Sequence, residues 1–536
     1  MRRLALTLAG AALLAPPAHA ARYAVGARDA ADLPRLQALL PGAESLAPIP
    51  ALVVERPSRP RLRELPGATY VERLGTRRVA FVPDDPLAPR QWHLEANRTF
   101  DFWDSPPLLP PVRVAVIDSG IDGTHPELAP RIAGAKTFVG GSAKVDEEGH
   151  GTFVAGLIAA GVDDAVGIAG MAPSAELLVA KVVDGDLIDV EAEVKAIRWA
   201  VRNGARVVNM SLGGLRDPRN PERDAYSRLE AEAVGWAHGR GAVVVAAVGN
   251  STDVPARPWP YASYPAALPH VLGVSALARD GSVPVFSHRD KIYNDLAAPG
   301  VGIVSTFPLP LTAGSKECVD QGYSVCASDE FRKGQGTSFA APQVSAAAAV
   351  LLAVRPRLRP EQVTALLTRS AHDVNAGSGC ASCPLQRDAL SGWGRLDLTA
   401  ALRALAGPIP PPDRLEPNDD AGRAAAPLWG AVKRIEATLD FWDDQSDVYA
   451  IRLRRRQPVY VSVRGPSGTD TNLILWRPGT SHVDDLASLS FVARQSARPG
   501  PREYLSYRAP ASGTYYVQVK LGSRGSGRYK LAIVKA

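Results

Sequence analysis

Val114-Ala-Val-Ile-Asp118 is a short apolar run that ends on a carboxylate, and it continues as the polar loop Ser-Gly-Ile-Asp-Gly-Thr-His-Pro-Glu127. An apolar run bounded by a turn-rich loop is typical of a buried strand. From this strand onward, apolar strands alternate with helical stretches, which predicts an α/β fold with an open parallel sheet and helices on both faces. We expect strands at 112–117, 176–183, 207–210, 243–247 and 271–274, and helices at 150–160, 190–203 and 228–240.

Two further segments supply polar side chains, Gly149-His150-Gly-Thr-Phe-Val-Ala-Gly156 and Gly336-Thr-Ser338-Phe-Ala-Ala-Pro342. Together with Asp118 they give a carboxylate, an imidazole and a hydroxyl in that order along the chain. A serine hydroxyl is a poor nucleophile near neutral pH, so acyl transfer needs an imidazole to accept its proton and a buried carboxylate to orient the imidazole. Because active sites of parallel sheets gather at the carboxyl ends of the strands, we expect Asp118, His150 and Ser338 to meet there.

These segments resemble the three signature blocks of the subtilisin-like serine endopeptidases, the subtilase family, over roughly residues 86 to 403. The resemblance implies that Ser338 is the nucleophile, that His150 is the general base and later the general acid, and that Asp118 orients the imidazole. Phe153 stands where the family usually has a second histidine, and Phe339 stands where methionine is commoner. Neither position carries the chemistry, so the departures bear on substrate preference.

Two other titratable residues lie in the first segment, His125 and Asp122. His125 follows Asp118 too closely, on the same polar loop, to serve as the general base. We expect Asp122 to be a surface residue of that loop.

The segment Val243-Val-Val-Ala-Ala-Val-Gly-Asn250 resembles the family segment whose asparagine donates a hydrogen bond to the oxyanion. The alternative is an asparagine in a tight turn after a strand. By the same resemblance, peptide substrates lie as an added strand along the segment 209–214. The predicted substrate-binding residues are Ser211, Leu212, Gly213, Ala247, Val248, Gly249 and Ser263. None of them is charged, which predicts a preference for uncharged, mainly apolar side chains before the scissile bond.

A structural calcium ion is a further expectation from the resemblance, although catalysis requires no cofactor. Glu127, Asp163 and Asp164 fall where the family often places calcium ligands, and carboxylate oxygens suit this ion. The loop is one residue longer than the common version, and Glu replaces the usual Asp. The alternative is a set of solvated loop carboxylates.

The N-terminus is typical of an export signal covering residues 1 to 20, with Arg2-Arg3, an apolar stretch and an Ala-His-Ala20 cleavage site. The arginine pair leaves a twin-arginine route open. We therefore expect a secreted, extracellular protein. The apolar run Val344 to Val354 is too short to span a bilayer and predicts a buried helix, so we expect no membrane anchor.

The composition is that of a globular protein that builds a sizeable core: 536 residues, 46% hydrophobic and 22% charged. The formal net charge is +6, but the arginines are scattered and are not interleaved with aromatic residues. We therefore expect no nucleic-acid partner.

The four cysteines of this exported chain predict disulfides. Three pairings are possible, and we favour the local pairs Cys318–Cys326 and Cys380–Cys383 because each closes a short loop. A zinc site made by all four cysteines is the alternative, although zinc ribbons normally show two Cys-x-x-Cys motifs.

The chain divides into a signal peptide at 1–20, a small α+β unit at 21–84, the catalytic domain at 85–406, a Pro-rich linker at 407–414 and a β-sandwich at 415–536. By resemblance, 21–84 is an inhibitory propeptide that is cleaved away; the alternative is an ordinary N-terminal extension. The segments Glu416-Pro-Asn-Asp419 and Asp444-Gln-Ser-Asp447 in the last part resemble the pre-peptidase C-terminal domain of secreted peptidases.

Taken together, these features predict a secreted serine endopeptidase that is made as a zymogen and acts on protein or peptide substrates, with its own propeptide as inhibitor. A secreted binding or scaffold protein with a degenerate peptidase fold is the alternative. An esterase of the α/β-hydrolase type would need a Gly-x-Ser-x-Gly elbow and the order Ser, Asp, His, and Ser338 lacks that elbow.

Overall fold

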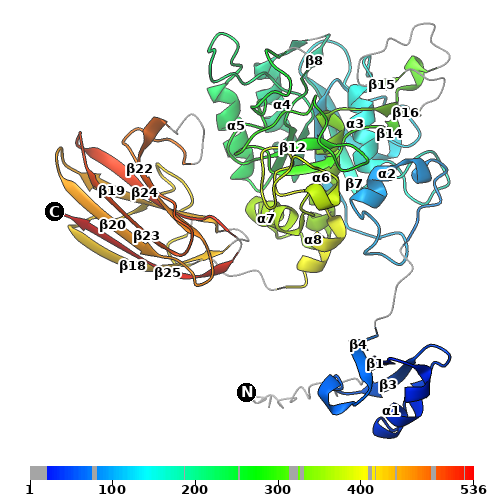
Figure 1. Ribbon diagram of the computed structural model, residues 1–536. Coiled ribbons are helices and arrows are strands. Elements are labelled where there is room, and N and C mark those ends of the chain that lie inside the picture. Colours follow the sequence, from blue (N-terminus) through cyan, green and yellow to red (C-terminus); the bar gives the residue numbers. More distant parts are fainter. Residues whose placement is uncertain are drawn as a thin grey trace, which may run out of the picture. The chain divides into compact units, whose positions relative to one another are not determined.

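A seven-stranded parallel sheet organises the α/β part of the chain (Figure 1). Its strands are β5 (Val112–Asp118), β6 (Ile132–Thr137), β7 (Ala175–Lys181), β10 (Val207–Met210), β11 (Val243–Ala247), β12 (Val271–Leu277) and β13 (Leu296–Pro299). They lie in the order β13-β12-β11-β10-β5-β7-β6. The predicted α/β fold is confirmed. We did not predict β6 and β13, the two edge strands, because their small residues give a weak strand signal.

The computed structural model describes residues 21–74, 81–185, 187–251, 254–312, 324–325, 331–407, 413–416, 418–440, 444–483, 490–523 and 525–536. The predicted signal peptide, the linker residues 408–412 and the predicted Cys318–Cys326 pair lie outside these ranges. The chain forms two compact units, Met1–Val79 and Ala80–Ala536.

Helices cover both faces of the sheet. They are α2 (Trp92–Ala96), α3 (His150–Ala159), α4 (Val190–Arg202), α5 (Arg228–His238), α6 (Thr337–Val354), α7 (Pro360–Ser370) and α8 (Leu398–Ala404). Alternate residues of β5 enter different cores: Val114 and Val116 pack in the core that contains α3 and α6, and Ala115 and Ile117 pack in the core that contains α4 and α5. Such alternation is what a strand covered on both sides requires.

Helix α6 runs through the first of these cores. It is long and apolar enough to cross a membrane by length and composition, yet 89% of it is buried inside the protein. The run Val344 to Val354 is therefore part of a buried core helix, as predicted. Short antiparallel strands complete this part: β8 (Val183–Asp184) with β9 (Leu187–Ile188), and β14 (Ile303–Thr306), β15 (Ser324–Val325) and β16 (Phe331–Gly334).

The beginning of α3 is fixed by a buried carboxylate that we did not predict. Asp146, 4% exposed, accepts hydrogen bonds from the backbone N–H groups of Gly149 and Thr152 at 2.9 and 2.8 Å and from the Ser119 hydroxyl at 2.8 Å. The first N–H groups of a helix have no partner within the helix, so this carboxylate satisfies them. It thereby ties α3 to the loop that follows β5.

The first unit is the predicted small α+β fold. Its sheet has the order β2-β3-β1-β4 and contains β1 (Ala21–Ala27), β2 (Glu44–Ser45), β3 (Ala51–Arg56) and β4 (Ala68–Arg73), with α1 (Leu33–Leu39). The helix-like stretch Arg61 to Leu65 forms only a three-residue 3₁₀ turn, Leu62–Glu64, because so short a segment cannot offset the cost of helix nucleation.

The boundary between the units falls at Val79, five residues before the predicted position at residue 84. The reason is that the segment after it bonds within the second unit. The Phe81 N–H donates to the Trp103 carbonyl at 3.0 Å, and the Asp85 carboxylate accepts from the N–H groups of Asp163 and Asp164 at 3.0 and 3.3 Å.

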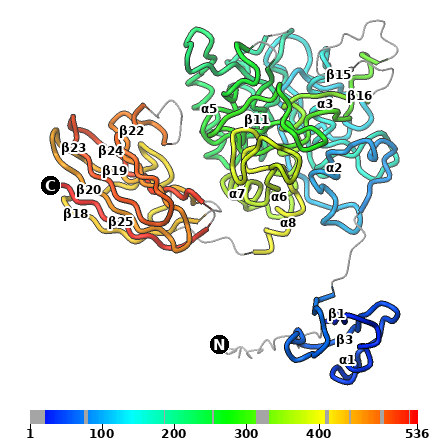
Figure 2. Tube along the Cα trace, viewed as in Figure 1, coloured from blue at the N-terminus to red at the C-terminus, as the bar shows by residue number. Residues whose placement is uncertain are grey.

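The C-terminal strands, coloured yellow to red in Figure 2, form the predicted β-sandwich. One sheet contains β17 (Ala426–Pro427), β19 (Ser446–Leu453), β21 (Thr471–Trp476), β22 (Val492–Ser496) and β24 (Gly513–Leu521). The other contains β18 (Val432–Asp440), β20 (Pro458–Arg464), β23 (Arg502–Arg508) and β25 (Ser526–Lys535). Their inner faces share a core that includes Tyr449, Tyr515 and Tyr529.

We predict that Asp146→Ala lowers the free energy of unfolding by about 1–3 kcal/mol, because it leaves the N–H groups of Gly149 and Thr152 buried without an acceptor. The measurement is urea unfolding of the Ser338→Ala chain, which cannot digest itself if Ser338 is the nucleophile. Glu176→Gln, at an exposed carboxylate of β7, is the control and should cost less than about 0.5 kcal/mol. Equal losses in both variants would contradict the capping role.

A second prediction concerns two buried glutamates where α4 packs on α5. Glu193 and Glu230 are each 3% exposed, and burial together with their mutual repulsion raises the pKa of Glu193, while burial raises the pKa of Glu230. The folded chain then holds protons that the unfolded chain releases, so the free energy of unfolding falls as pH rises above the unfolded value of 4.5. Glu193→Gln should stabilise the protein at pH 8 by on the order of 1 kcal/mol and change little at pH 4.5.

Urea unfolding at the two pH values tests this second prediction. Glu191→Gln, exposed on the same helix and paired with Lys195, is the matched control and should show no such pH dependence. A Glu193→Gln variant that is equally destabilised at both pH values would contradict this prediction.

Candidate active site

The carboxylate and the imidazole of the predicted triad are in direct contact. Asp118 ends β5 and is 2% exposed, and its Oδ1 lies 2.7 Å from Nδ1 of His150, the first residue of α3. Close approach of α3 to the end of β5 needs a glycine next to His150, because a Cβ at Gly151 would lie 2.0 Å from the Gly120 carbonyl oxygen. The Ser119 N–H also donates to Asp118 Oδ1, at 2.8 Å.

The electrostatics around His150 favour its charged form. Burial lowers the pKa of His150, but the charge and the hydrogen bond of Asp118, with further contributions from Asp146 and Glu148, outweigh burial and raise it above 6.5. Burial and the charges of Asp146 and Asp118 in turn raise the pKa of Glu148 to about 7. An imidazole whose protonated form is stabilised in this way is suited to accept a proton from a neighbouring hydroxyl.

Ser338 is the second residue of α6, at the end of the helix where free N–H groups favour negative charge. The start of α6 lies beside His150, because the rings of His150 and Phe339 are 5.7 Å apart between centroids. Within the described residues no hydrogen bond joins His150 and Ser338; such bonds are often long before substrate binds.

A polar relay fixes the backbone of Ser338. The Ser211 hydroxyl donates to the Ser338 carbonyl at 2.8 Å, Asn209 Nδ2 donates to Ser211 Oγ at 3.0 Å, and the Ser345 hydroxyl donates to Asn209 Oδ1 at 2.8 Å. Asn209 and Ser345 are fully buried. The relay connects the end of β10 with two positions of α6 that lie about two turns apart, so the substrate-binding segment and the serine are held in one frame.

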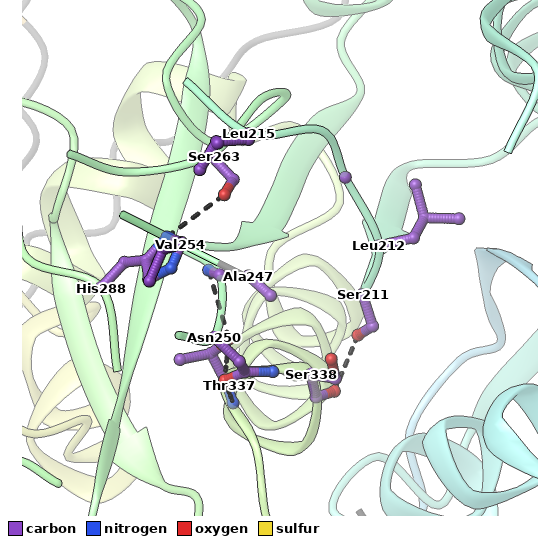
Figure 3. A pocket seen from close by; sticks show the side chains of 12 residues that line it. Ser211, Leu212, Leu215, Ala247, Asn250, Val254, Ser263, His288, Thr337 and Ser338 are labelled. Atoms are coloured by element: carbon purple, nitrogen blue, oxygen red, sulfur yellow. Dashed lines mark hydrogen bonds between the residues drawn. The ribbon is translucent and has the colours of Figure 1, made fainter. Parts of the chain in front are cut away.

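Asn250 lies beside Ser338 and Thr337 in the cleft (Figure 3). Its Oδ1 accepts from both the N–H and the hydroxyl of Thr337, at 3.0 Å each. This anchors the amide oxygen and leaves the amide N–H₂ group as the donor for the cleft. The geometry fits an oxyanion donor better than a simple turn asparagine, because the side chain reaches across to the helix that carries Ser338.

The cleft next to Ser338 is a pocket of about 260 Å³. Six of the seven predicted substrate-binding residues line it: Ser211, Leu212, Gly213, Ala247, Gly249 and Ser263. The seventh, Val248, is fully buried behind the wall and was wrongly assigned to it, since alternate residues of an extended segment face opposite ways. Figure 3 shows Ser211 and Leu212 on one side of the pocket and His288 on the other.

His288 is the pocket residue that we did not predict. It is 2% exposed, its Nδ1 lies 3.2 Å from Ser263 Oγ, and burial lowers its pKa to about 4. It is therefore a neutral imidazole near pH 7. Gly249, with φ +105°, makes room for this pair, because a Cβ there would lie 2.4 Å from Ser263 Oγ and 2.5 Å from His288 Nδ1.

The two residues excluded from catalysis are both buried. His125 packs edge-on against Phe331 and accepts the Glu127 N–H at 3.3 Å. Asp122 was expected at the surface but is 5% exposed, because its carboxylate accepts the N–H groups of Thr124 and Leu309 at 2.9 Å each.

The carboxylates predicted to hold calcium accept hydrogen bonds from backbone N–H groups. Glu127 accepts the N–H groups of Gly161 and Ile168 at 2.9 and 3.0 Å. Asp163 accepts the N–H of Asp84 at 3.3 Å, and Asp164 accepts the N–H of Val166 at 3.1 Å. Burial and the charges of Asp164 and Asp85 also raise the pKa of Glu127 to about 7, and calcium binding by this loop stays a prediction.

A different group of carboxylates does converge. The oxygens of Glu416, Asp444 and Asp447 in the β-sandwich lie within 4.8 Å of one another. Burial and mutual repulsion raise the pKa of Asp444 and Asp447, and one oxygen of each of the three has no hydrogen-bond partner among the described residues. The backbone N–H of Asn418 donates to Glu416 at 3.2 Å, and the fully buried side-chain amide of Asn418 has no partner among the described residues. These oxygens fit a hard divalent cation.

Cys380 and Cys383 form one of the two predicted disulfides.

Comparison with known proteins agrees with this geometry. The model of the subtilase family of peptidases matches residues 111–394. The chain is 33% identical over 348 residues to fervidolysin of Fervidobacterium pennivorans, covering 60% of this chain and 45% of that protein. It is 34% identical over 265 residues to subtilisin DY of Bacillus licheniformis, covering 49% and 84%.

A third relative is the major intracellular serine protease of Bacillus subtilis (strain 168), 38% identical over 247 residues, covering 45% of this chain and 68% of that protein. The chain thus spans less than half of the length of fervidolysin and most of the length of the two smaller relatives. With the family model covering more than half of its residues, the chain belongs to the subtilase family.

Proposed function

We propose that this chain is a secreted serine endopeptidase that hydrolyses peptide bonds through an acyl-enzyme on Ser338. The observation that carries the proposal is the 2.7 Å contact between the buried Asp118 carboxylate and His150, beside the start of the helix that bears Ser338. The relatives named serine protease and subtilisin support the same chemistry.

In the acylation step, the Ser338 hydroxyl attacks the scissile carbonyl while His150 Nε2 accepts its proton. Asp118 holds the other ring nitrogen as the donor and stabilises the imidazolium that forms. The negative oxygen of the tetrahedral intermediate accepts hydrogen bonds from the Ser338 N–H and the Asn250 amide. His150 then gives the proton to the leaving amine, and the ester remains on Ser338.

In the deacylation step, a water molecule replaces the amine. His150 accepts a proton from the water, the hydroxide attacks the ester, and the same donors hold the oxyanion. Collapse of the intermediate returns the proton to Ser338 and releases the acid product. The fixed donors around the cleft need no rearrangement during the reaction, which is the source of their contribution to the rate.

The predicted export signal and the small N-terminal unit support a zymogen that is activated after secretion. Residues 21–74 have their own sheet and core, as an inhibitory propeptide needs for folding. In this proposal the protease removes the propeptide itself.

We predict that the chain 21–536 shortens with time by loss of its N-terminal unit, and that Ser338→Ala stays intact. The measurement is chain mass over time with N-terminal sequencing. Labelling with a serine-directed fluorophosphonate should mark Ser338 only in the processed wild type. A stable wild-type chain that takes no label, even after limited proteolysis removes the N-terminal unit, would favour the scaffold alternative.

The pocket beside Ser338 favours uncharged side chains. The described residues that line it include no carboxylate and no cationic side chain, and His288 is neutral at pH 7. A buried ion in such a pocket would lose its hydration without a partner. We propose a preference for uncharged, mainly apolar residues before the scissile bond.

Profiling of cleavage sites on a peptide library should therefore give dominant cuts after uncharged residues. Ser263→Ala, which removes the hydroxyl that contacts His288, should shift the profile further toward apolar residues and leave fluorophosphonate labelling unchanged. Dominant cuts after Lys or Arg in the wild type would refute the proposed preference.

We also propose that calcium, when bound, is a structural ion of the β-sandwich held by Glu416, Asp444, Asp447 and the Asn418 oxygen. The ion would neutralise carboxylates that otherwise repel one another. In the loop with Glu127, by contrast, the carboxylate accepts hydrogen bonds from the backbone N–H groups of Gly161 and Ile168.

Removal of calcium with EDTA should lower the melting temperature of the Ser338→Ala chain by several degrees, about 2–8 °C, and added calcium should restore it. Asp444→Asn should abolish this response, and Asp163→Asn, the matched change in the catalytic loop, should retain it. The reverse pattern would place the ion at the loop.

A further inference from the structure

A second cavity, of about 710 Å³, opens on the α/β part and shares no lining residue with the pocket beside Ser338. Its walls come from α2 and the turns that follow it, from the end of β12, and from the segment before α8. The side chains that decide its chemistry are Trp92, Glu95, Arg98, Asp101, Arg279 and Arg395. A volume of this size is typical of sites that bind small molecules.

One of the three arginines is already neutralised. Arg98 Nε lies 2.9 Å from Asp101, and its Nη1 lies 3.0 Å from Asp397. The other oxygen of Asp397 accepts the N–H of Ala400 at the start of α8, at 2.7 Å. Both carboxylates near Arg98 are thus bonded to it; Asp397 also attracts Arg395, but within the described part of the chain neither carboxylate forms an ion pair with Arg279 or Arg395.

Arg395 is the arginine whose surroundings point to a missing ligand. Its backbone is fixed by the pair of hydrogen bonds with His372, at 2.7 and 2.8 Å, so its side chain starts from a rigid point. The side chain is half-buried, and its Nε is buried without a hydrogen-bond partner among the described residues. Burial and the nearby charge of Arg98 lower the pKa of Arg395, against the attraction of Asp397. A buried N–H donor without an acceptor is unfavourable, and buried polar groups normally have partners.

Arg279 lies on the same cavity wall and is exposed, and it too has no hydrogen bond or ion pair within the described part of the chain. A planar guanidinium offers several N–H donors in a fixed fork that matches the oxygens of phosphate and carboxylate groups. A ligand held between the two arginines would supply the acceptor that Arg395 lacks.

We propose that Arg279 and Arg395 form an anion site, separate from the active site, that binds the phosphate or carboxylate group of a small molecule. Glu95, an exposed carboxylate on the same wall, repels such a ligand and limits its affinity. The indole of Trp92, fixed by its N–H bond to the Val301 carbonyl at 3.0 Å, offers an apolar surface for the rest of the molecule. The site does not depend on the proposed protease activity.

The test is isothermal titration calorimetry of the full chain with Ser338→Ala, using inorganic phosphate at low ionic strength. We expect saturable binding that weakens with added NaCl. Arg395→Gln and Arg279→Gln should each weaken binding, by about tenfold for Arg395, because each removes a charge-assisted hydrogen bond. Glu95→Gln should tighten it. Arg202→Gln, at an exposed arginine of α4, is the matched control and should change nothing.

A second arm distinguishes the two kinds of ligand. An N-acetylated dipeptide with a free C-terminal carboxylate is compared with its C-terminal amide, each as a competitor of phosphate. Competition by the acid alone identifies a peptide carboxylate as a ligand of the site, and competition by neither restricts the site to phosphate.

The proposal is overturned if neither anion binds at about 10 mM, or if Arg279→Gln, Glu95→Gln and Arg202→Gln all bind as the parent does. Arg395→Lys is a control for misfolding, because lysine keeps the positive charge but lacks the forked N–H donors of the guanidinium. The two exposed positions, Arg279 and Glu95, decide the question even if every variant of Arg395 is unstable.

Discussion

The structure depends on a negative charge that is kept out of water. Asp118 is 2% exposed at the end of β5, and its carboxylate is held by the Ser119 N–H and by His150. A charge in this position is tolerated only because donors meet it, and the donors are in place only because α3 packs directly on the strand end. Gly151 permits that packing, and Asp146 fixes the first turn of the helix. The contact between acid and imidazole is therefore a consequence of how sheet and helix meet.

The other half of the active site is built into a second buried helix of the α/β part. Helix α6 lies in the apolar core, so its first turn, with Ser338, cannot move independently of the sheet. Buried polar residues on β10 and α6 connect the serine to the segment that lines the pocket. A rigid frame of this kind serves catalysis because donors that are already oriented cost little to use during the reaction.

Buried charged groups have different sets of partners in three parts of the molecule. Around His150, Asp146 accepts several hydrogen bonds and Asp118 Oδ1 contacts the imidazole, and the charges of both raise the pKa of His150, although Asp118 Oδ2 has no partner among the described residues. In the β-sandwich, Asp444 and Asp447 repel each other and keep oxygens without partners. Beside α2, Arg395 is the cationic counterpart, with a buried Nε that has no acceptor among the described residues. The cation and the anion proposed above would supply the missing partners in the last two cases.

The sequence alone determined the α/β class, the order of its central strands along the chain and the identity of the groups at their carboxyl ends, because periodicity and local motifs are encoded in neighbouring residues. The tertiary structure alone decided which of these groups meet and what surrounds them. Val248 turned out to lie behind the pocket wall and His288 in it, since 25 residues separate Ser263 from its partner and no local pattern reports such a contact. The hydrogen bonds that Glu127 accepts from Gly161 and Ile168 were likewise not predictable from the local sequence, because they depend on the packing of distant segments.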